Sequence, residues 1–173
     1  MVSKLTWSAL LIACLFSMPL AAQDVQPHPP EILLTVSGES SPPVNLTAAD
    51  LAKLPRRTVR ASDHGKEGVF EGVLLGEVLK LAGVSLGEKL HGGQLALYLV
   101  VEASDGYRAV FALPEVDSAF TDREILLTDR RDGQPLSAKE GPLRIVVPDE
   151  KRQARWVRQV IALRIQRDSG RRP

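Results

Sequence analysis

The sequence has very little cysteine and no excess of charge of either sign. Cysteine occurs once in 173 residues, at Cys14, which excludes a disulfide framework and a zinc site built from cysteines. The 22 Lys and Arg residues nearly balance the 21 Asp and Glu residues. A protein dedicated to nucleic acid needs a basic excess to compete for phosphates, so we exclude nucleic acid as a partner. The three histidines show no spacing typical of metal ligands, and we predict no metal site.

Long apolar runs are also scarce, and the one near the start predicts an export signal. Lys4 precedes a mostly apolar run, 5–16, that has the length of a signal-peptide core and is too short to cross a hydrocarbon layer of about 30 Å. We predict a signal peptide over 1–22 and a polar leader over 23–30. The mature protein is then periplasmic or secreted and does not span the membrane. Residues 171–173 are predicted to be a frayed tail.

A lipoprotein is the alternative for this end of the chain. Leu11-Ile12-Ala13-Cys14 resembles a bacterial lipoprotein cleavage box, in which Cys14 would be acylated. The residues that follow it are apolar, however, and do not form a polar tether. Cleavage after Ala22 instead leaves a mature chain without cysteine, which excludes thiol catalysis and disulfide exchange.

Residues 31–170 form one predicted domain, because 44% of the sequence is hydrophobic, 25% is charged, and no repeat or linker interrupts it. We predict the α+β class, with a mixed β-sheet or open barrel and short helices. The predicted elements are strands at 32–36, 57–61, 95–101, 107–111, 125–127, 143–147 and 163–166, loops at 38–43 and 63–68, and helices at 48–54, 74–82 and 154–160. The predicted buried residues are Phe70, Leu75, Leu79, Val100, Phe111, Val146 and Trp156.

The helices are predicted from their ends and their spacing. Thr47 followed by Asp50 is typical of a capping box, which starts the first helix. Apolar residues three and four positions apart predict the second helix, which ends at Gly83. The third prediction rests on Trp156, Val157 and Val160, which would face inward from one helix.

Three segments, in their order along the chain, carry a resemblance to a known family. The first begins Phe70-Glu71-Gly72-Val73-Leu74-Leu75, and the second is Ala103-Ser104-Asp105-Gly106-Tyr107. The third contains Asp132-Gly133-Gln134-Pro135-Leu136, Gly141-Pro142-Leu143-Arg144 and Arg155-Trp156-Val157. Together they resemble the molybdopterin-binding domain of the sulfite oxidase family, over about residues 31–166. The resemblance implies a mixed α+β fold and makes molybdopterin a possible cofactor.

The sequence departs from that family where the metal would bind. The resemblance implies that catalytic members hold molybdenum through a pterin dithiolene and one cysteine thiolate, placed after the strand predicted here at 57–61. This chain has Ala61-Ser62-Asp63-His64 at that place. A glycine-containing loop of the family is replaced by the charged residues 149–153. We therefore expect no bound cofactor.

The first functional hypothesis is an exported, non-catalytic module. It would bind a small anionic ligand or a periplasmic protein partner in the groove where relatives hold the cofactor. The alternative is a molybdopterin-dependent oxidoreductase whose metal is bound by Ser62, Asp63 or His64. A third hypothesis is a structural partner domain that uses its basic C-terminal end.

That basic end is a run of four cations, Lys151, Arg152, Arg155 and Arg158. Such a run suits an acidic partner or membrane head groups. The alternative is a solvated face that is balanced by carboxylates elsewhere on the domain.

Six polar residues are candidates for the groove, and no catalytic residue is assigned. They are Ser62, His64, Ser104, Asp105, Tyr107 and Arg144. Residues 62–64 hold the residue types of a hydrolase triad, but adjacent residues cannot converge as a triad does, so a solvated loop is the alternative. Ser104 and Asp105 also suit the chemistry of a tight turn.

Tyr107 and Arg144 each allow two interpretations. The hydroxyl of Tyr107 lines a pocket, or its ring is a core or edge aromatic of a hairpin. The charge of Arg144 lies within a predicted buried strand and must find a partner. Arg144 therefore pairs with a carboxylate or faces an anionic ligand.

The export prediction is tested by mass spectrometry of the exported protein. We expect a mature chain that begins at Gln23, because the apolar run and the small residues Ala21 and Ala22 favour cleavage there. A mature chain that begins at a diacylated Cys14 would contradict this prediction and establish the lipoprotein.

Overall fold

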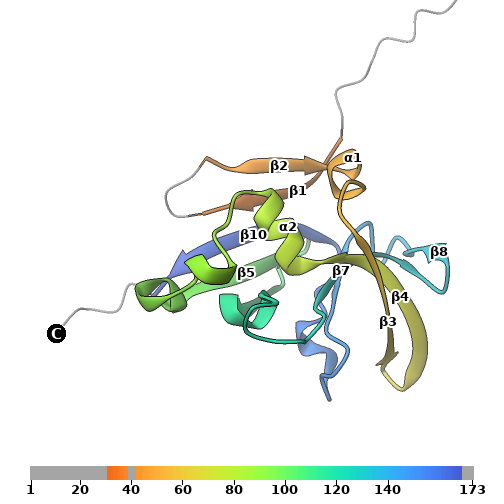
Figure 1. Ribbon diagram of the computed structural model, residues 1–173. Helices are drawn as coiled ribbons and strands as arrows, with labels where there is room; N and C mark the ends of the chain where they lie inside the picture. Colours follow the sequence, from red (N-terminus) through yellow and green to blue (C-terminus); the bar gives the residue numbers. More distant parts are fainter. Residues whose placement is uncertain (1–30, 39–41, 169–173) are drawn as a thin grey trace, which may run out of the picture.

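The computed structural model describes residues 31–38 and 42–168 (Figure 1). The predicted signal peptide with Cys14, the whole polar leader over 23–30 and the predicted tail lie outside the described residues. Among the residues that the structure describes, no helix is long and apolar enough to cross a membrane.

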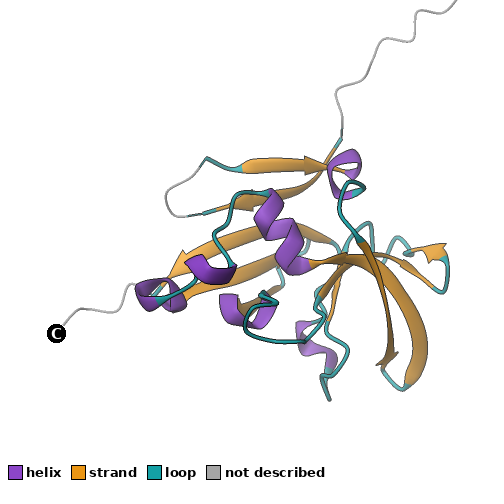
Figure 2. Cartoon of the chain, viewed as in Figure 1, coloured by secondary structure: helices purple, strands orange, loops and turns teal. Residues whose placement is uncertain are grey.

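Two β-sheets make up the domain, the first mixed and the second antiparallel, as Figure 2 shows. The first has the order β2-β1-β10-β5-β6, in which β1 and β10 are parallel and the other neighbours are antiparallel. Its strands are β1 (Ile32–Ser37), β2 (Val44–Thr47), β5 (Leu97–Ala103), β6 (Arg108–Ala112) and β10 (Val160–Arg167). The second has the order β3-β4-β7-β8, and β9 also pairs with β7. Its strands are β3 (Arg56–Asp63), β4 (Lys66–Leu74), β7 (Leu126–Arg131), β8 (Gln134–Pro135) and β9 (Arg144–Val146).

The helical elements are short and lie between the strands. They are α1 (Ala48–Leu51), α2 (Leu75–Leu81) and the 3-10 turns η1 (Gly87–Lys89), η2 (Gly92–Ala96), η3 (Leu113–Val116) and η4 (Gln153–Arg155). With these open sheets and short helices, the predicted α+β class is confirmed.

The capping box predicted at Thr47 is confirmed. The hydroxyl of Thr47 accepts from the Asp50 amide at 3.3 Å, and the Asp50 carboxylate accepts from the Thr47 amide at 3.1 Å. These bonds satisfy amides that have no partner within the first helical turn. The helix ends at Leu51, earlier than predicted, and α2 ends shortly before Gly83, whose φ of +84° suits glycine.

The helix predicted over 154–160 is wrong. Only the single turn η4 forms, and Val160 begins β10. The backbone of this segment bonds instead to the β9 segment: the Ile145 amide donates to the Val157 carbonyl at 2.8 Å, and the Val160 amide donates to the Leu143 carbonyl at 2.9 Å. Backbone groups that pair with a strand cannot also form a helix.

The strands β2, β4 and the two-residue β8 were not predicted, and β4 takes up much of the loop predicted at 63–68. The chain turns sharply at His64 and Gly65, whose φ angles are +50° and +79°, so β4 already begins at Lys66. β4 then lies so close to β7 that a Cβ on Gly72 would come within 2.2 Å of the Leu127 carbonyl oxygen. Glycine is therefore needed at this position of the strand.

All seven predicted core residues are buried. The rings of Phe70 and Trp156 meet edge to face, with centroids 5.6 Å apart, and join β4 to the segment after η4. The helix α2 contributes Leu75 and Leu79 to the same core.

Truncation of a core aromatic tests this packing. Phe111 is completely buried, so Phe111→Ala should lower the free energy of unfolding by about 3–5 kcal/mol, measured by urea denaturation. Phe120→Ala is the matched control, because that ring is 49% exposed and its loss should cost less than about 1 kcal/mol. Equal costs for the two variants would show that Phe111 is not a core residue.

Candidate functional site

A pocket of about 310 Å³ lies where two hairpin tips approach the segment around η4. We call it the hairpin pocket. Other hollows of the described surface have comparable volumes, but this one is lined by four of the six candidate residues predicted from the sequence. Its polar lining residues are His64, Asp105, Tyr107, Arg144, Gln153 and Arg158, and its apolar walls include Ala103, Trp156 and Val157.

The first wall is the tip of the β3–β4 hairpin. His64 takes a left-handed backbone conformation there, which histidine adopts more readily than most residues. Its imidazole is 70% exposed, and its Nε2 lies 3.8 Å from Oδ1 of Asp63. Ser62 does not line the hairpin pocket; its carbonyl accepts from the side-chain amide of Gln153 at 2.9 Å, which joins the hairpin to the start of η4.

The second wall is the tip of the β5–β6 hairpin. The carboxylate of Asp105 accepts from the Tyr107 amide at 2.9 Å, and Gly106 follows with a φ of +85°. This is the turn chemistry considered for Asp105 in the sequence. Ser104 lies outside the lining, where its hydroxyl bonds to Gln159 at 3.0 Å.

Tyr107 joins the second wall to the third wall, which is the segment around η4. Its ring is 49% exposed and lines the hairpin pocket, so it is not a core aromatic. Its hydroxyl donates to the Ala154 carbonyl in η4 at 2.6 Å. The hydroxyl therefore fixes the η4 segment against the β5–β6 hairpin.

Arg144 forms the floor, and its guanidinium is paired inside the protein. The side chain is 1% exposed, and Nη1 donates to Asp63 at 3.0 Å and to Glu140. The guanidinium also lies over the rings of Trp156 and Phe70, at 5.3 and 5.7 Å from their centroids. Of the two interpretations of Arg144, the structure shows the carboxylate pair.

Asp63 stays ionised below the hairpin pocket. Burial would raise the pKa of this carboxyl, but the hydrogen bond and charge of Arg144, with the charges of Arg131 and His64, hold the pKa below its usual value. Arg131 approaches Asp63 at 3.2 Å. Two guanidinium groups thus occupy Oδ2, while Oδ1 and the Arg144 Nε are buried without a hydrogen-bond partner.

The residues at the hairpin pocket do not fit a molybdenum cofactor. No cysteine occurs in the described residues, and of the three substitute ligands considered, only His64 lines the pocket. Within 31–38 and 42–168, no three His, Cys, Asp or Glu residues are grouped so that they could hold a metal ion. A single imidazole is a poor replacement for the soft thiolate that such a metal favours.

Sequence reasoning missed Gln153 and Arg158 as lining residues. Gln153 lies in the charged loop that was interpreted only as a departure from the family, and Arg158 was assigned only to the basic end. The neighbouring Trp156 belonged to a motif of the family resemblance, and that motif was the one sequence signal for this part of the pocket.

Two comparisons with known proteins agree with this fold. The family model for the oxidoreductase molybdopterin binding domain matches residues 61–170. The sulfane dehydrogenase SoxCD from Paracoccus pantotrophus is similar in structure, with a TM-score of 0.58 and 23% identity over 76% of this chain and 37% of that chain. At this identity the likeness shows the fold alone, and the chain spans little more than a third of that protein's length. No curated protein matches the sequence.

Removal of the Asp63 charge tests the ion pair with Arg144. Asp63→Asn should lower the free energy of unfolding by about 1.5–3 kcal/mol at pH 7, because Arg144 loses a buried charged partner. A lowered folded-state pKa stabilises the protein fully above the unfolded-state pKa of about 3.9, and this stabilisation is lost as the pH falls through the folded-state value. The difference between wild type and variant, measured by urea denaturation, should therefore shrink below about pH 4.

Asp122→Asn is the control, because Asp122 is an exposed carboxylate outside this network. It should change stability by less than about 0.5 kcal/mol. A stability loss for Asp63→Asn that stays constant down to low pH would contradict the charged pair.

Proposed function

The chain belongs to the oxidoreductase molybdopterin binding domain family, and from this membership we propose that it is an exported, non-catalytic member that binds a ligand or partner at the hairpin pocket. One observation carries the proposal: the pocket has no thiolate, and the buried charges at its floor are paired with each other. Because the residues present do not fit the cofactor, we derive no redox step.

The loop over 149–153 also supports the proposal. It contains no glycine, and two of its side chains, Glu150 and Gln153, bond within the protein. Glu150 accepts from Arg155 Nε at 2.7 Å, and Gln153 donates to the Ser62 carbonyl. A backbone that must approach a phosphate closely usually needs glycine, which this loop does not contain.

The export part of the proposal rests on the sequence of residues 1–22. Lys4 and the apolar run that follows it have the order of a signal peptide, so we place the protein in the periplasm or outside the cell. The acylated Cys14 is the alternative route to the same side of the membrane.

A molybdopterin-dependent oxidoreductase is the second candidate, and His64 is the observation that favours it. Its imidazole lines the hairpin pocket at the hairpin that follows β3, where the family resemblance places the metal ligand. Imidazole binds several transition metals, although it is harder and less electron-rich than thiolate.

Metal analysis distinguishes the two candidates. Protein made in cells with a working molybdopterin pathway should carry less than about a tenth of an equivalent of molybdenum or tungsten, measured by mass spectrometry of the metal. The Ser62→Cys variant should remain equally empty, because Ser62 does not line the hairpin pocket and the 149–153 loop is unchanged.

A catalytic protein of the same family, made in the same cells, is the positive control for cofactor supply. Near-stoichiometric molybdenum with pterin in the wild-type chain would overturn the non-catalytic proposal. The His64→Ala variant would then test whether the imidazole is the metal ligand.

A further inference from the structure

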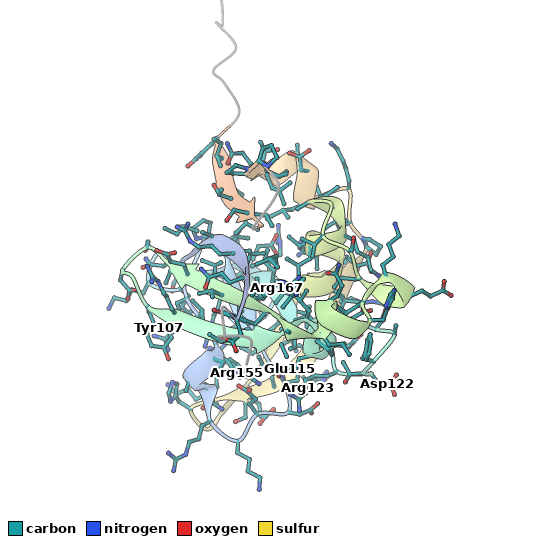
Figure 3. The ribbon with its side chains drawn as sticks, turned by 90° about the vertical axis from the view of Figure 1, so that its left-hand side faces the viewer. Tyr107, Glu115, Asp122, Arg123, Arg155 and Arg167 are labelled. Atoms are coloured by element: carbon teal, nitrogen blue, oxygen red, sulfur yellow. The ribbon has the colours of Figure 1, made fainter. Side chains whose placement is uncertain are left out.

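The cations around the hairpin pocket are unevenly paired. Arg155 is engaged: it pairs with Glu115 at 3.0 Å and with Glu150, and its guanidinium lies 4.4 Å from the Phe111 ring centroid. Figure 3 shows Arg155 beside Glu115, with Arg123 on the other side of that carboxylate. Arg155 therefore holds η4 on β6 and η3 and is not free to bind a partner.

Three other cations of this segment are exposed and form no ion pair with any residue of the described ranges: Lys151, Arg152 and Arg158. Together with His64 we call them the basic rim. Arg158 and His64 line the hairpin pocket itself, and Lys151 and Arg152 precede its lining residue Gln153. The bond from Gln153 to the Ser62 carbonyl holds this part of the loop against the hairpin that carries His64.

Several carboxylates near the basic rim are already bonded within the protein. Asp105 is the one acid that lines the hairpin pocket within the described chain, and it accepts a hydrogen bond from the Tyr107 amide. Asp63 is neutralised by Arg144 and Arg131, and Glu150 pairs with Arg155. Glu140 pairs with Arg144, and Asp149 in the loop and Glu67 on β4 are further acids of these segments. Exposed cations that have no internal carboxylate partner, placed beside a concave site, attract anions.

We propose that the hairpin pocket and its basic rim dock an acidic segment of a partner protein. This inference rests on the non-catalytic function proposed above. One carboxylate enters the pocket beside Arg158, whose planar guanidinium can bind both carboxylate oxygens, and His64. Neighbouring carboxylates of the segment meet Lys151 and Arg152.

The spread of the basic rim favours a chain over a small anion or a membrane. Lys151 and Arg152 are not among the residues that line the cavity, so an ion confined to about 310 Å³ would leave both unused. A lipid surface would meet protruding cations but would not fill a hollow. A flexible peptide with several carboxylates satisfies both the pocket and the rim.

The test measures binding of a fluorescent hexaglutamate peptide to the metal-free mature protein by anisotropy, with hexaglutamine as the uncharged comparison. The variant Lys151→Gln/Arg152→Gln/Arg158→Gln should bind hexaglutamate about tenfold more weakly or worse, because three exposed ion pairs are lost. The matched control, Lys53→Gln/Lys80→Gln/Lys89→Gln, removes the same charge from residues that do not line the pocket and should change the affinity less than about twofold. Thermal unfolding of both triple variants checks that each is folded. If the rim variant does not fold, the single variant Arg158→Gln replaces it and should weaken binding about two- to fivefold.

Equal losses in the rim and control variants would overturn the inference, because binding would then follow net charge alone. Absence of hexaglutamate binding at low salt would also overturn the docking inference, while the proposed non-catalytic function would stand. Bound molybdenum would instead overturn the non-catalytic function. Inorganic sulfate and phosphatidylglycerol vesicles are tested beside the peptide. If either binds through the basic rim and hexaglutamate does not compete with it, the site belongs to a small anion or a membrane and the inference fails.

Discussion

The arrangement of the hairpin pocket depends on one buried cation, the guanidinium of Arg144. It lies on β9, pairs with Asp63 at the end of β3 and with Glu140, and is enclosed by the rings of Phe70 and Trp156. A charge at this depth is tolerated only if it is paired and hydrogen-bonded. Contacts to this one side chain therefore hold the tip of the β3–β4 hairpin and the segment after η4 together.

This pairing separates the charges that stabilise the fold from those that can meet a ligand. The floor offers no net charge, because the guanidinium groups of Arg144 and Arg131 are matched by the carboxylates of Asp63 and Glu140. Arg155 is likewise matched by Glu115 and Glu150 at the third wall. What remains for recognition is the rim, where Arg158 lines the cavity without a carboxylate partner among the described residues. Exposed cations of this kind cost little in stability and act chiefly on the rate and selectivity of binding.

Local signals predicted the local structure, and the errors arose where distant segments meet. The Thr47 capping box and the spacing of α2 are readable because their partners lie within four residues. Trp156, Val157 and Val160 were correctly predicted as buried, but the same spacing fits a helix and an irregular segment whose backbone bonds to the β9 segment. The β4 strand was hidden by Gly68 and Gly72, and the close contact with the β7 backbone requires the second of these glycines. Arg144 was expected to have a partner, yet no pattern could identify Asp63, 81 positions away.

The motifs that carry the family resemblance prove to be packing motifs. Phe70, Arg144 and Trp156 come from three separate motifs and contact one another in the core, and the motif at 103–107 forms a tight turn. Such residues stabilise this architecture whether or not a cofactor binds, so a match through them identifies the fold and leaves the chemistry open. The chemistry has to be judged from the side chains that face the hairpin pocket. Those side chains include two cations, of which Arg144 is paired within the protein, an imidazole, a carboxylate and a phenol, but no thiolate that would suit a soft metal.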